Sequence, residues 1–382
     1  VFTKEGASTL LFLPLAHVFG RVIQLAMLRA RVTIGHSPNP GTLLRDLAGF
    51  KPTFLLAVPR VFEKVYNGAA QKAHDASPVK GKIFDAATAT AIAYSQSLDE
   101  GGPSAGLKAK HAVFDHLVYS KLRAAMGGRV THAISGGASL GPRLGHYFRG
   151  LGLTVLEGYG LTETTAGTTL NIPGAIKIGS VGKPVFGTEV HIADDGEILL
   201  RGHHIFGGYW NNPQATSEVM TTDGWFHSGD VGKLDSEGYL YITGRKKELL
   251  VTSAGKNVAP TVLEDRLRSH PIVSQCVVVG DGRPFIAALV TLDQDALPGI
   301  LASHEIDDAP LEKLVDDPRV RAIVQQAVNS ANEAVSNSEA IKKFVILPLD
   351  LTIENGYLTP KLSIKRHIIN EDFADVINGI YE

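Results

Sequence analysis

Short apolar runs of strand length alternate with longer helical patterns through the first part of the chain, and this alternation limits the folds open to it. Four runs predict buried strands, namely Leu10–Leu15, Thr53–Val58, Val130–Ile134 and Thr154–Glu157. Helical patterns occupy much of the sequence between them, at Arg60–Ala76, Lys82–Leu98, Leu107–Met126 and Ser139–Arg149. Strand, loop and helix in this order are typical of an α/β fold in which helices cover a largely parallel sheet.

The pattern changes twice further along the chain. Short strands at Val190–Ile192 and Ile198–Arg201, joined by a hairpin turn at Asp194–Gly196, predict a small antiparallel β subdomain. After Arg245 the elements expected are helix Pro260–Ser269, strands Val273–Val279 and Phe285–Leu292, and helix Pro318–Ser336. We therefore expect three parts: an α/β core subdomain at 1–176, a small β subdomain at 177–244 and an α+β domain at 245–382.

Composition excludes several classes of protein. The chain has 382 residues, of which 44% are hydrophobic, so it has ample material for two or three cores. A net charge of −2 without a basic block argues against a nucleic-acid partner. No apolar stretch approaches the roughly 18–20 residues of a membrane span. The single cysteine, Cys276, excludes a disulfide framework, favours a cytoplasmic location and, in an apolar run, is expected to be inert.

The segment Leu156–Thr164 is the strongest local signal. It follows a predicted buried strand, and ligands in α/β sheets collect at the carboxyl ends of strands. Glycines on either side of Tyr159 would let the backbone approach a flat ring closely. Thr162 offers a hydroxyl to a phosphate oxygen, and Glu163 offers a carboxylate suited to Mg²⁺. The alternative is an ordinary strand-to-helix turn capped by Thr162.

Two further clusters carry polar or flexible residues. Ser135–Ala138 follows the strand at Val130–Ile134 and would lie on a nearby strand end in a parallel sheet, although a tight turn explains it equally well. Trp225–Asp230 precedes Arg245 by fifteen positions, counted from Asp230. A carboxylate such as Asp230 on a turn can accept both hydroxyls of a ribose, and the fork of Arg245 can reach a phosphate or the same ribose. Alternatively, Asp230 bonds its own turn and Arg245 is a solvated charge.

Together and in this order, the clusters resemble the adenylate-forming superfamily of acyl-CoA synthetases, adenylation domains and luciferases. The resemblance runs from Leu13 to about Arg366. Within the superfamily, three segments resemble the long-chain fatty-acid–CoA ligases, particularly the bacterial ones: Phe12–Arg21, Val58–Val65 and Gly255–Pro260. The resemblance implies the carboxyl-terminal part of the enzyme core, a parallel sheet with helices plus a small β subdomain, followed by a small α+β domain.

The resemblance also implies a reaction and its residues. A fatty carboxylate would attack the α-phosphate of ATP with the help of Mg²⁺, and CoA would then displace AMP from the acyl-adenylate. The residues implied to line the adenine pocket are Gly136, Gly137, Ala138, Glu157, Gly158, Tyr159, Gly160 and Leu161. Thr162 would touch the α-phosphate and Glu163 would hold Mg²⁺. Asp230 would take the ribose hydroxyls with the assistance of Arg245.

Other positions are implied to serve the acyl group, CoA and domain rotation. His17 would stand at the carboxylate end of the acyl pocket, unless it is simply a histidine satisfied within its loop. Lys247 falls where this family hinges its carboxyl-terminal domain. Gly255 would admit the CoA arm after rotation. Lys246 and Lys256 would meet CoA phosphates, although exposed lysines are more often merely solvated.

Two departures from the superfamily pattern matter. The Ser/Thr/Gly-rich phosphate loop is absent, so we expect an amino-terminal segment of the same enzyme upstream of Val1, and we expect the chain alone to bind adenylate weakly without turnover. Near the other end, Ser363 occupies the position of the adenylation lysine. Lys361 and Lys365 lie two residues to either side, on one face if the segment is extended, and we favour Lys361 as the substitute.

Three functional alternatives follow from these observations. A long-chain acyl-CoA ligase leads, an adenylating enzyme that loads a carrier protein is the nearest rival, and a catalytically impaired nucleotide-binding module is the third. Peripheral membrane contact is compatible with a fatty substrate, but no basic amphipathic helix requires it.

Overall fold

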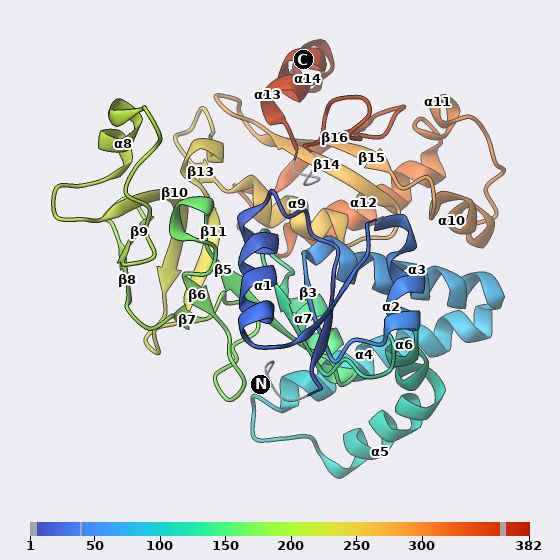
Figure 1. The fold of residues 1–382 in the computed structure, drawn as a ribbon. Coiled ribbons are helices and arrows are strands. Elements are labelled where there is room, and N and C mark those ends of the chain that lie inside the picture. The colour runs from blue at the N-terminus through green and yellow to red at the C-terminus, as the bar shows by residue number, and fades with distance from the viewer. Residues whose placement is uncertain (1–5, 39, 360–363) are drawn as a thin grey trace. The chain divides into compact units, whose positions relative to one another are not determined.

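The computed structural model describes residues 6–38, 40–359 and 364–382. The chain divides into two compact units, Val1–Ile242 and Thr243–Glu382 (Figure 1). This division lies close to the expected start of the carboxyl-terminal domain at residue 245. The further boundary expected at 176/177 stays a prediction.

A five-stranded mixed sheet forms the centre of the first unit. Its strands, in spatial order, are β3 (Phe54–Ala57), β4 (His132–Ser135), β5 (Thr154–Tyr159), β6 (Thr169–Leu170) and β7 (Lys183–Pro184). β3, β4 and β5 are parallel, whereas β6 and β7 pair in antiparallel fashion. Ser135 lies opposite both Ala57 and Glu157, so the carboxyl ends of the three parallel strands meet at one edge of the sheet. A separate parallel pair is made by β1 (Ser8–Leu11) and β2 (Thr33–His36).

Helices pack around these strands (Figure 1). They are α1 (Val18–Arg29), α2 (Leu43–Phe50), α3 (Pro59–Ala76), α4 (Pro78–Ser97), α5 (Ala105–Phe114), α6 (Ser120–Ala125) and α7 (Pro142–Gly150). Proline opens α3, α4 and α7, where its fixed φ suits the first helical turn. Leu55 of β3 packs in one buried core with Phe62 of α3 and Phe148 of α7. At Gly150 the helices α4 and α7 come so close that a Cβ would lie 2.0 Å from the Ala91 carbonyl oxygen.

Several expected boundaries are wrong, each for a local reason. The strand expected at Leu10–Leu15 ends at Leu11, because the Pro14 carbonyl accepts the His17 N–H and turns the chain into α1. The helix expected at Leu107–Met126 is interrupted by a π-helical turn at Asp115–Tyr119. The helix expected from Ser139 begins at Pro142, since Gly141 has a φ of 80°.

An antiparallel four-stranded sheet follows in the chain, as the hairpin signals predict. Its order is β11 (Leu240–Arg245), β10 (Phe226–Leu234), β9 (Glu197–Gly202) and β8 (Thr188–Ile192). Between His227 and Val231 the register of β10 against β9 shifts, which marks a bulge. Helix α8 (Pro213–Val219) lies between β9 and β10 in the sequence. Leu200, Phe226 and Leu240 form the buried core of this sheet, with Tyr159 of β5 packed against it.

The second unit contains a three-stranded sheet with helices on both faces. Its elements are η4 (Lys246–Glu248), β12 (Leu250–Val251), β13 (Asn257–Val258), α9 (Pro260–Arg268), β14 (Val273–Val279), β15 (Ile286–Leu292), α10 (Leu297–Ser303), α11 (Leu311–Leu314), α12 (Pro318–Asn332), β16 (Ile341–Ile346), α13 (Arg366–Asp372) and α14 (Ala374–Tyr381). β15 is central, antiparallel to β14 and parallel to β16. Cys276 and Val278 of β14 face a core shared with α9 and α12. Val277 and Val279 face a core shared with α13 and α14, so every residue of β14 is buried.

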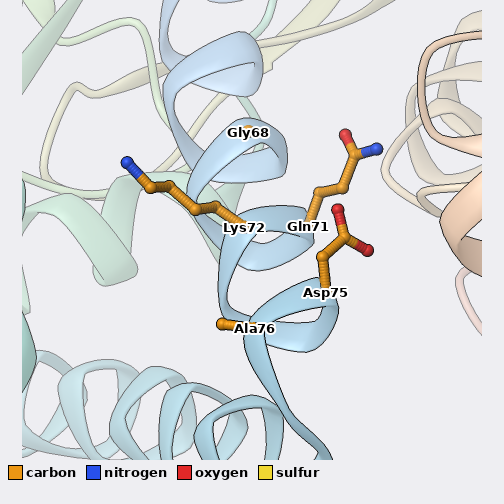
Figure 2. A pocket seen from close by; sticks show the side chains of 5 residues that line it. All are labelled: Gly68, Gln71, Lys72, Asp75 and Ala76. Atoms are coloured by element: carbon orange, nitrogen blue, oxygen red, sulfur yellow. The ribbon is translucent and has the colours of Figure 1, made fainter.

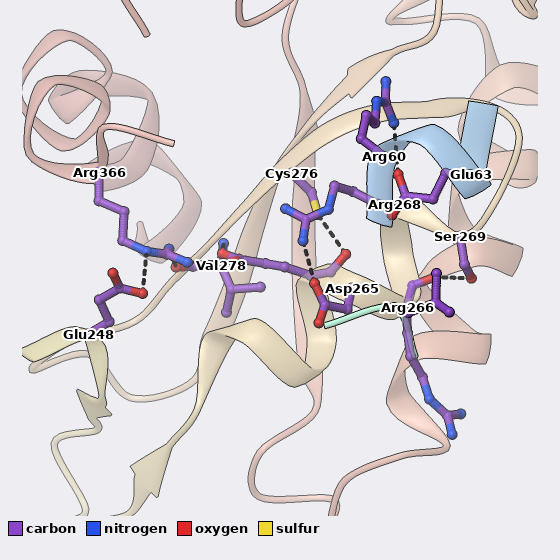
Figure 3. Close-up of polar contacts among 12 residues, drawn as sticks. Arg60, Glu63, Glu248, Asp265, Arg266, Arg268, Ser269, Cys276, Val278 and Arg366 are labelled. Atoms are coloured by element: carbon purple, nitrogen blue, oxygen red, sulfur yellow. Dashed lines mark hydrogen bonds and ion pairs between the residues drawn. The ribbon is translucent and has the colours of Figure 1, made fainter. Parts of the chain in front are cut away.

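Cys276 has the environment of a packing residue. Its Sγ lies 3.4 Å from the Glu264 carbonyl oxygen in the core of the second unit (Figure 3). Burial raises the pKa of the Cys276 thiol well above its usual range. The thiolate that reacts with electrophiles is therefore scarce at neutral pH.

We expect Cys276 in the folded protein to resist 5,5′-dithiobis(2-nitrobenzoic acid) at pH 8 for hours, and to react within minutes in 6 M guanidinium chloride as burial ends. Absorbance at 412 nm measures both rates. Rapid reaction of one thiol per chain under native conditions would contradict the inert assignment.

Among the residues that the structure describes, no helix is both long and apolar enough to cross a membrane.

Candidate functional site

The segments Ser135–Ala138 and Leu156–Thr164 come together at the carboxyl ends of β4 and β5, as predicted for neighbouring parallel strands. Gly136 directly follows β4, and a Cβ placed there would lie 3.6 Å from the Gly158 carbonyl oxygen and 3.8 Å from Phe19 Cζ. Gly137 has a φ of 87°, which only glycine adopts without strain. The hydroxyl of Ser135 is buried at this edge, and no partner for it occurs within the described residues.

Glu157 ties these two segments to each other. Its side chain is buried, and its Oε1 accepts the Leu140 N–H at 2.9 Å. The carboxylate of β5 thereby holds the loop that carries Gly136, Gly137 and Ala138 after β4. Glu157 consequently shapes the edge of the sheet, and its predicted contact with adenine stays a prediction.

The glycines on either side of Tyr159 serve the packing of this chain itself. β5 runs to Tyr159, so the loop expected after Glu157 starts later than predicted. A Cβ on Gly160 would lie 1.3 Å from the Ala166 carbonyl oxygen, and one on Gly158 would lie 2.9 Å from Leu170 Cδ1. A backbone carbonyl therefore leaves no room for a side chain at Gly160, and the Leu170 side chain leaves little room at Gly158.

Tyr159 and Asp230 meet across two sheets. The Tyr159 hydroxyl donates to Asp230 Oδ2 at 2.7 Å, and Asp230 is only 4% exposed. The expectation of Asp230 on a turn is wrong, because it lies inside β10 in the bulge between His227 and Val231. A buried carboxylate beside a tyrosine at the edge of a sheet can accept hydrogen bonds from paired hydroxyls of a sugar.

Glu163 lies in the short 3₁₀ helix η3 (Thr162–Thr164), half-buried, whereas Thr162 is exposed. Thr162 does not cap this turn, since the Leu161 N–H donates to the Thr164 hydroxyl at 2.9 Å. The Tyr209 hydroxyl donates to Glu163 Oε1 at 3.0 Å. Burial, together with this hydrogen bond to Glu163, raises the pKa of Tyr209. Sequence reasoning missed Tyr209, because no local pattern links two residues 46 positions apart.

His17 caps a helix. It precedes α1, and its Nδ1 accepts the Phe19 N–H at 3.2 Å. The geometry agrees with the alternative of a histidine satisfied locally, and the role of His17 in an acyl pocket stays a prediction.

The remaining site residues belong to the second unit. Arg245 ends β11, and Lys246 and Lys247 follow in η4, all three exposed. Gly255, with a φ of 77°, turns β12 into β13 and has open space where a Cβ would stand. Lys256 Nζ pairs with Glu339 Oε1 at 3.5 Å, so this lysine is not simply solvated.

The segment expected to carry the adenylation lysine lies largely outside the described residues. Lys361 and Ser363 lie outside the described residues. Lys365 precedes α13 and donates its N–H to the Tyr357 carbonyl at 2.9 Å. The described ranges contain no group of three or more His, Cys, Asp or Glu side chains arranged to hold a metal ion.

Two surface hollows are lined by none of the predicted site residues. One of about 380 Å³ is lined by Gly68, Gln71, Lys72, Asp75 and Ala76, all on α3 (Figure 2). The other, of about 250 Å³ in the second unit, includes Arg283 and Arg366 among its lining residues. Neither hollow contains Tyr159, Glu163 or Asp230.

Comparison with known proteins identifies the class. The AMP-binding enzyme family matches residues 2–210, and the AMP-binding enzyme C-terminal domain matches residues 247–382. The chain therefore belongs to the AMP-binding enzymes, and the predicted fold class is confirmed.

Among individual relatives, the long-chain-fatty-acid–CoA ligases FadD15 of Mycobacterium bovis and Mycobacterium tuberculosis are each 53% identical over 99% of this chain. The chain spans 63% of the length of either relative. The adenylation domain of a carboxylate reductase from Mycobacterium chelonae has the same fold, with a TM-score of 0.73 and 22% identity over 100% of this chain and 56% of that one. A carboxylic acid reductase domain from Segniliparus rugosus, solved with AMP and a carboxylic acid, gives a TM-score of 0.70 at 23% identity, covering 98% and 54% of the two chains.

Proposed function

We propose that the chain is the larger part of an ATP-dependent long-chain fatty-acid–CoA ligase, which forms an acyl-adenylate and transfers the acyl group to CoA. The observation that carries the proposal is the hydrogen bond from Tyr159 to the buried Asp230 carboxylate, beside the adjacent ends of β4 and β5. The relatives named long-chain-fatty-acid–CoA ligase support the choice of substrate.

In this proposal each residue near the edge of the sheet binds or orients one part of the nucleotide. Adenine lies against Gly136–Ala138 and the Tyr159 ring, and Asp230 accepts the ribose hydroxyls. Arg245 assists with the ribose or a phosphate, and Thr162, which is exposed, meets the α-phosphate. These contacts would hold the α-phosphate still for attack by the fatty carboxylate, so catalysis rests on positioning.

Glu163 fits Mg²⁺ in its chemistry, because a half-buried carboxylate is the hard oxygen donor that this ion prefers. Bound there, Mg²⁺ would neutralise phosphate charge. Tyr209 would keep Glu163 Oε1 in a fixed direction through its hydrogen bond.

CoA would enter along the β12–β13 turn at Gly255, with Lys246 and Lys256 near its phosphates and Lys247 at the hinge. A cytoplasmic location, with peripheral membrane contact for the fatty substrate, completes the proposal. Alanine substitutions of Lys361 and Lys365, assayed separately for pyrophosphate release, would distinguish which lysine serves adenylation.

The test measures AMP affinity and acyl-CoA formation for Asp230→Ala. We expect AMP affinity to fall about 10- to 100-fold, since hydrogen bonds to a charged group contribute roughly 1.5–3 kcal/mol. The matched control is Glu189→Ala, an exposed carboxylate of β8 that pairs with Arg201. Unchanged AMP affinity in Asp230→Ala would refute the assignment of this site.

Three outcomes separate the ligase from its rivals. Palmitate with ATP and CoA should give palmitoyl-CoA in the complete enzyme. Adenylate formation with transfer only to a carrier protein would favour the carrier-loading enzyme. AMP binding without any adenylate formation would favour the impaired nucleotide-binding module.

A further inference from the structure

The bulge of β10 decides where Asp230 points. Successive side chains of a strand face opposite sides of a sheet, so a one-residue change of register would turn a side chain to the other face. The register of β10 against β9 shifts between His227 and Val231, and Gly229 adopts a φ of 71° within this stretch. The direction of the Asp230 carboxylate therefore depends on whatever holds the bulge in place.

Glu197, the first residue of β9, holds the bulge directly. Its Oε1 accepts the Gly229 N–H at 2.9 Å, and its Oε2 lies 3.1 Å from His227 Nδ1. Glu197 is only 5% exposed, although it is a carboxylate. Such burial is costly unless the charge is bonded, so the bonds to the bulge account for a glutamate in this position.

A second link runs through Ser228. Its hydroxyl donates to the Ile198 carbonyl at 2.6 Å and accepts the Asp230 N–H at 3.1 Å. The start of β9 thus bonds Ser228 and Gly229 directly, and it holds Asp230 through the Ser228 hydroxyl. The Asp230 carboxylate, in turn, accepts a hydrogen bond from the Tyr159 hydroxyl.

We propose that Glu197 is a positioning residue, which fixes the β10 bulge so that the Asp230 carboxylate faces the ribose of the nucleotide. The proposal rests on the proposed function of Asp230. Without the Glu197 carboxylate, the Gly229 N–H loses its partner and the bulge can relax toward regular pairing. Asp230 would then turn from the ribose while the adenine contacts of β4 and β5 remain.

The test compares AMP with 2′,3′-dideoxyadenosine monophosphate, which lacks both ribose hydroxyls. We expect Glu197→Ala to weaken AMP about tenfold and to change the affinity for the dideoxy compound less than twofold. Glu197→Gln keeps an acceptor for Gly229 and should restore most of the AMP affinity. Glu189→Ala in the same sheet should change neither ligand, because the exposed Glu189 carboxylate pairs with Arg201 and not with a residue of the bulge.

Ligand-observed NMR titration measures these affinities even when binding is weak. In Glu197→Ala/Asp230→Ala, no loss beyond that of Asp230→Ala is expected, since both changes act through one carboxylate. If Glu197→Ala fails to fold, Ser228→Ala loosens the same bulge and should show the same selective loss for AMP.

Equal weakening of both ligands by Glu197→Ala, or no weakening of either, would overturn the positioning role. Failure of the proposed function gives a different result: Asp230→Ala itself would no longer separate AMP from the dideoxy compound. In that case the role of Glu197 falls together with that of Asp230.

Discussion

Replacing Arg366 with methionine is expected to lower the free energy of unfolding of the second unit by about 3–5 kcal/mol. The guanidinium of Arg366 donates to Glu264 Oε2 and lies 3.7 Å from Glu248 Oε2 (Figure 3). The Glu264 side chain is 3% exposed, and its Oε1 accepts the Val278 N–H of β14 at 2.8 Å. Removal of the arginine leaves a buried charge without its cation, and this costs much more than the loss of an exposed pair.

Two variants make this prediction specific. Arg366→Met/Glu264→Gln removes the stranded charge and keeps an acceptor for Val278, so it should recover a large part of the stability. Arg319→Met breaks the exposed pair with Asp317 and should change the stability little, because solvent screens such a pair.

Urea unfolding can separate the two units, because both tryptophans, Trp210 and Trp225, belong to the first. Far-ultraviolet circular dichroism should show the early transition of the second unit in Arg366→Met, while tryptophan fluorescence should keep its midpoint. An Arg366→Met protein as stable as Arg319→Met would contradict the burial of the pair.

The sequence predicted those elements that depend on local pattern. β14 was expected at Val273–Val279 and lies at those residues, because five of its seven residues are valine or cysteine, which suit a strand buried on both faces. The helix α3 was expected at Arg60–Ala76 and begins one residue earlier, at Pro59. It was predictable because a proline after a strand is typical of the first turn of a helix. The proximity of the segments after β4 and β5 was also predictable, because neighbouring parallel strands bring their carboxyl ends together.

Interactions over long distances in the sequence were not predictable. One local turn was missed as well: the Pro14 carbonyl accepts the His17 N–H after β1, and hydrophobic periodicity does not record such a bond. Tyr159 and Asp230 are 71 positions apart. The hydrogen bond from the Gly229 N–H to Glu197 joins β10 to β9, across 32 positions. The sequence motif indicates that Asp230 lies near a nucleotide. The bulge that sets the direction of its carboxylate becomes visible only in the pairing of β10 with β9.

Gly160→Ala is expected to disturb the site more than any other small change in the glycine-containing segments. The new Cβ would lie 1.3 Å from the Ala166 carbonyl oxygen, where two atoms cannot coexist. That carbonyl cannot easily retreat, because Thr164 Oγ1 donates to it at 3.2 Å and the Ala166 N–H donates to the Leu161 carbonyl at 3.0 Å. The segment from Leu161 to Ala166, which carries Thr162 and Glu163, must therefore move.

We expect Gly160→Ala to destabilise the first unit by about 1–3 kcal/mol or more, as overpacking of a rigid site does, and to weaken AMP at least tenfold. Gly167→Ala is the matched control, because a Cβ on Gly167 meets no atom within 4 Å and its φ is not positive. Tryptophan fluorescence in urea and NMR titration with AMP measure the two effects. If Gly160→Ala behaves like Gly167→Ala in both, then the close approach of Gly160 to the Ala166 carbonyl does not shape this site.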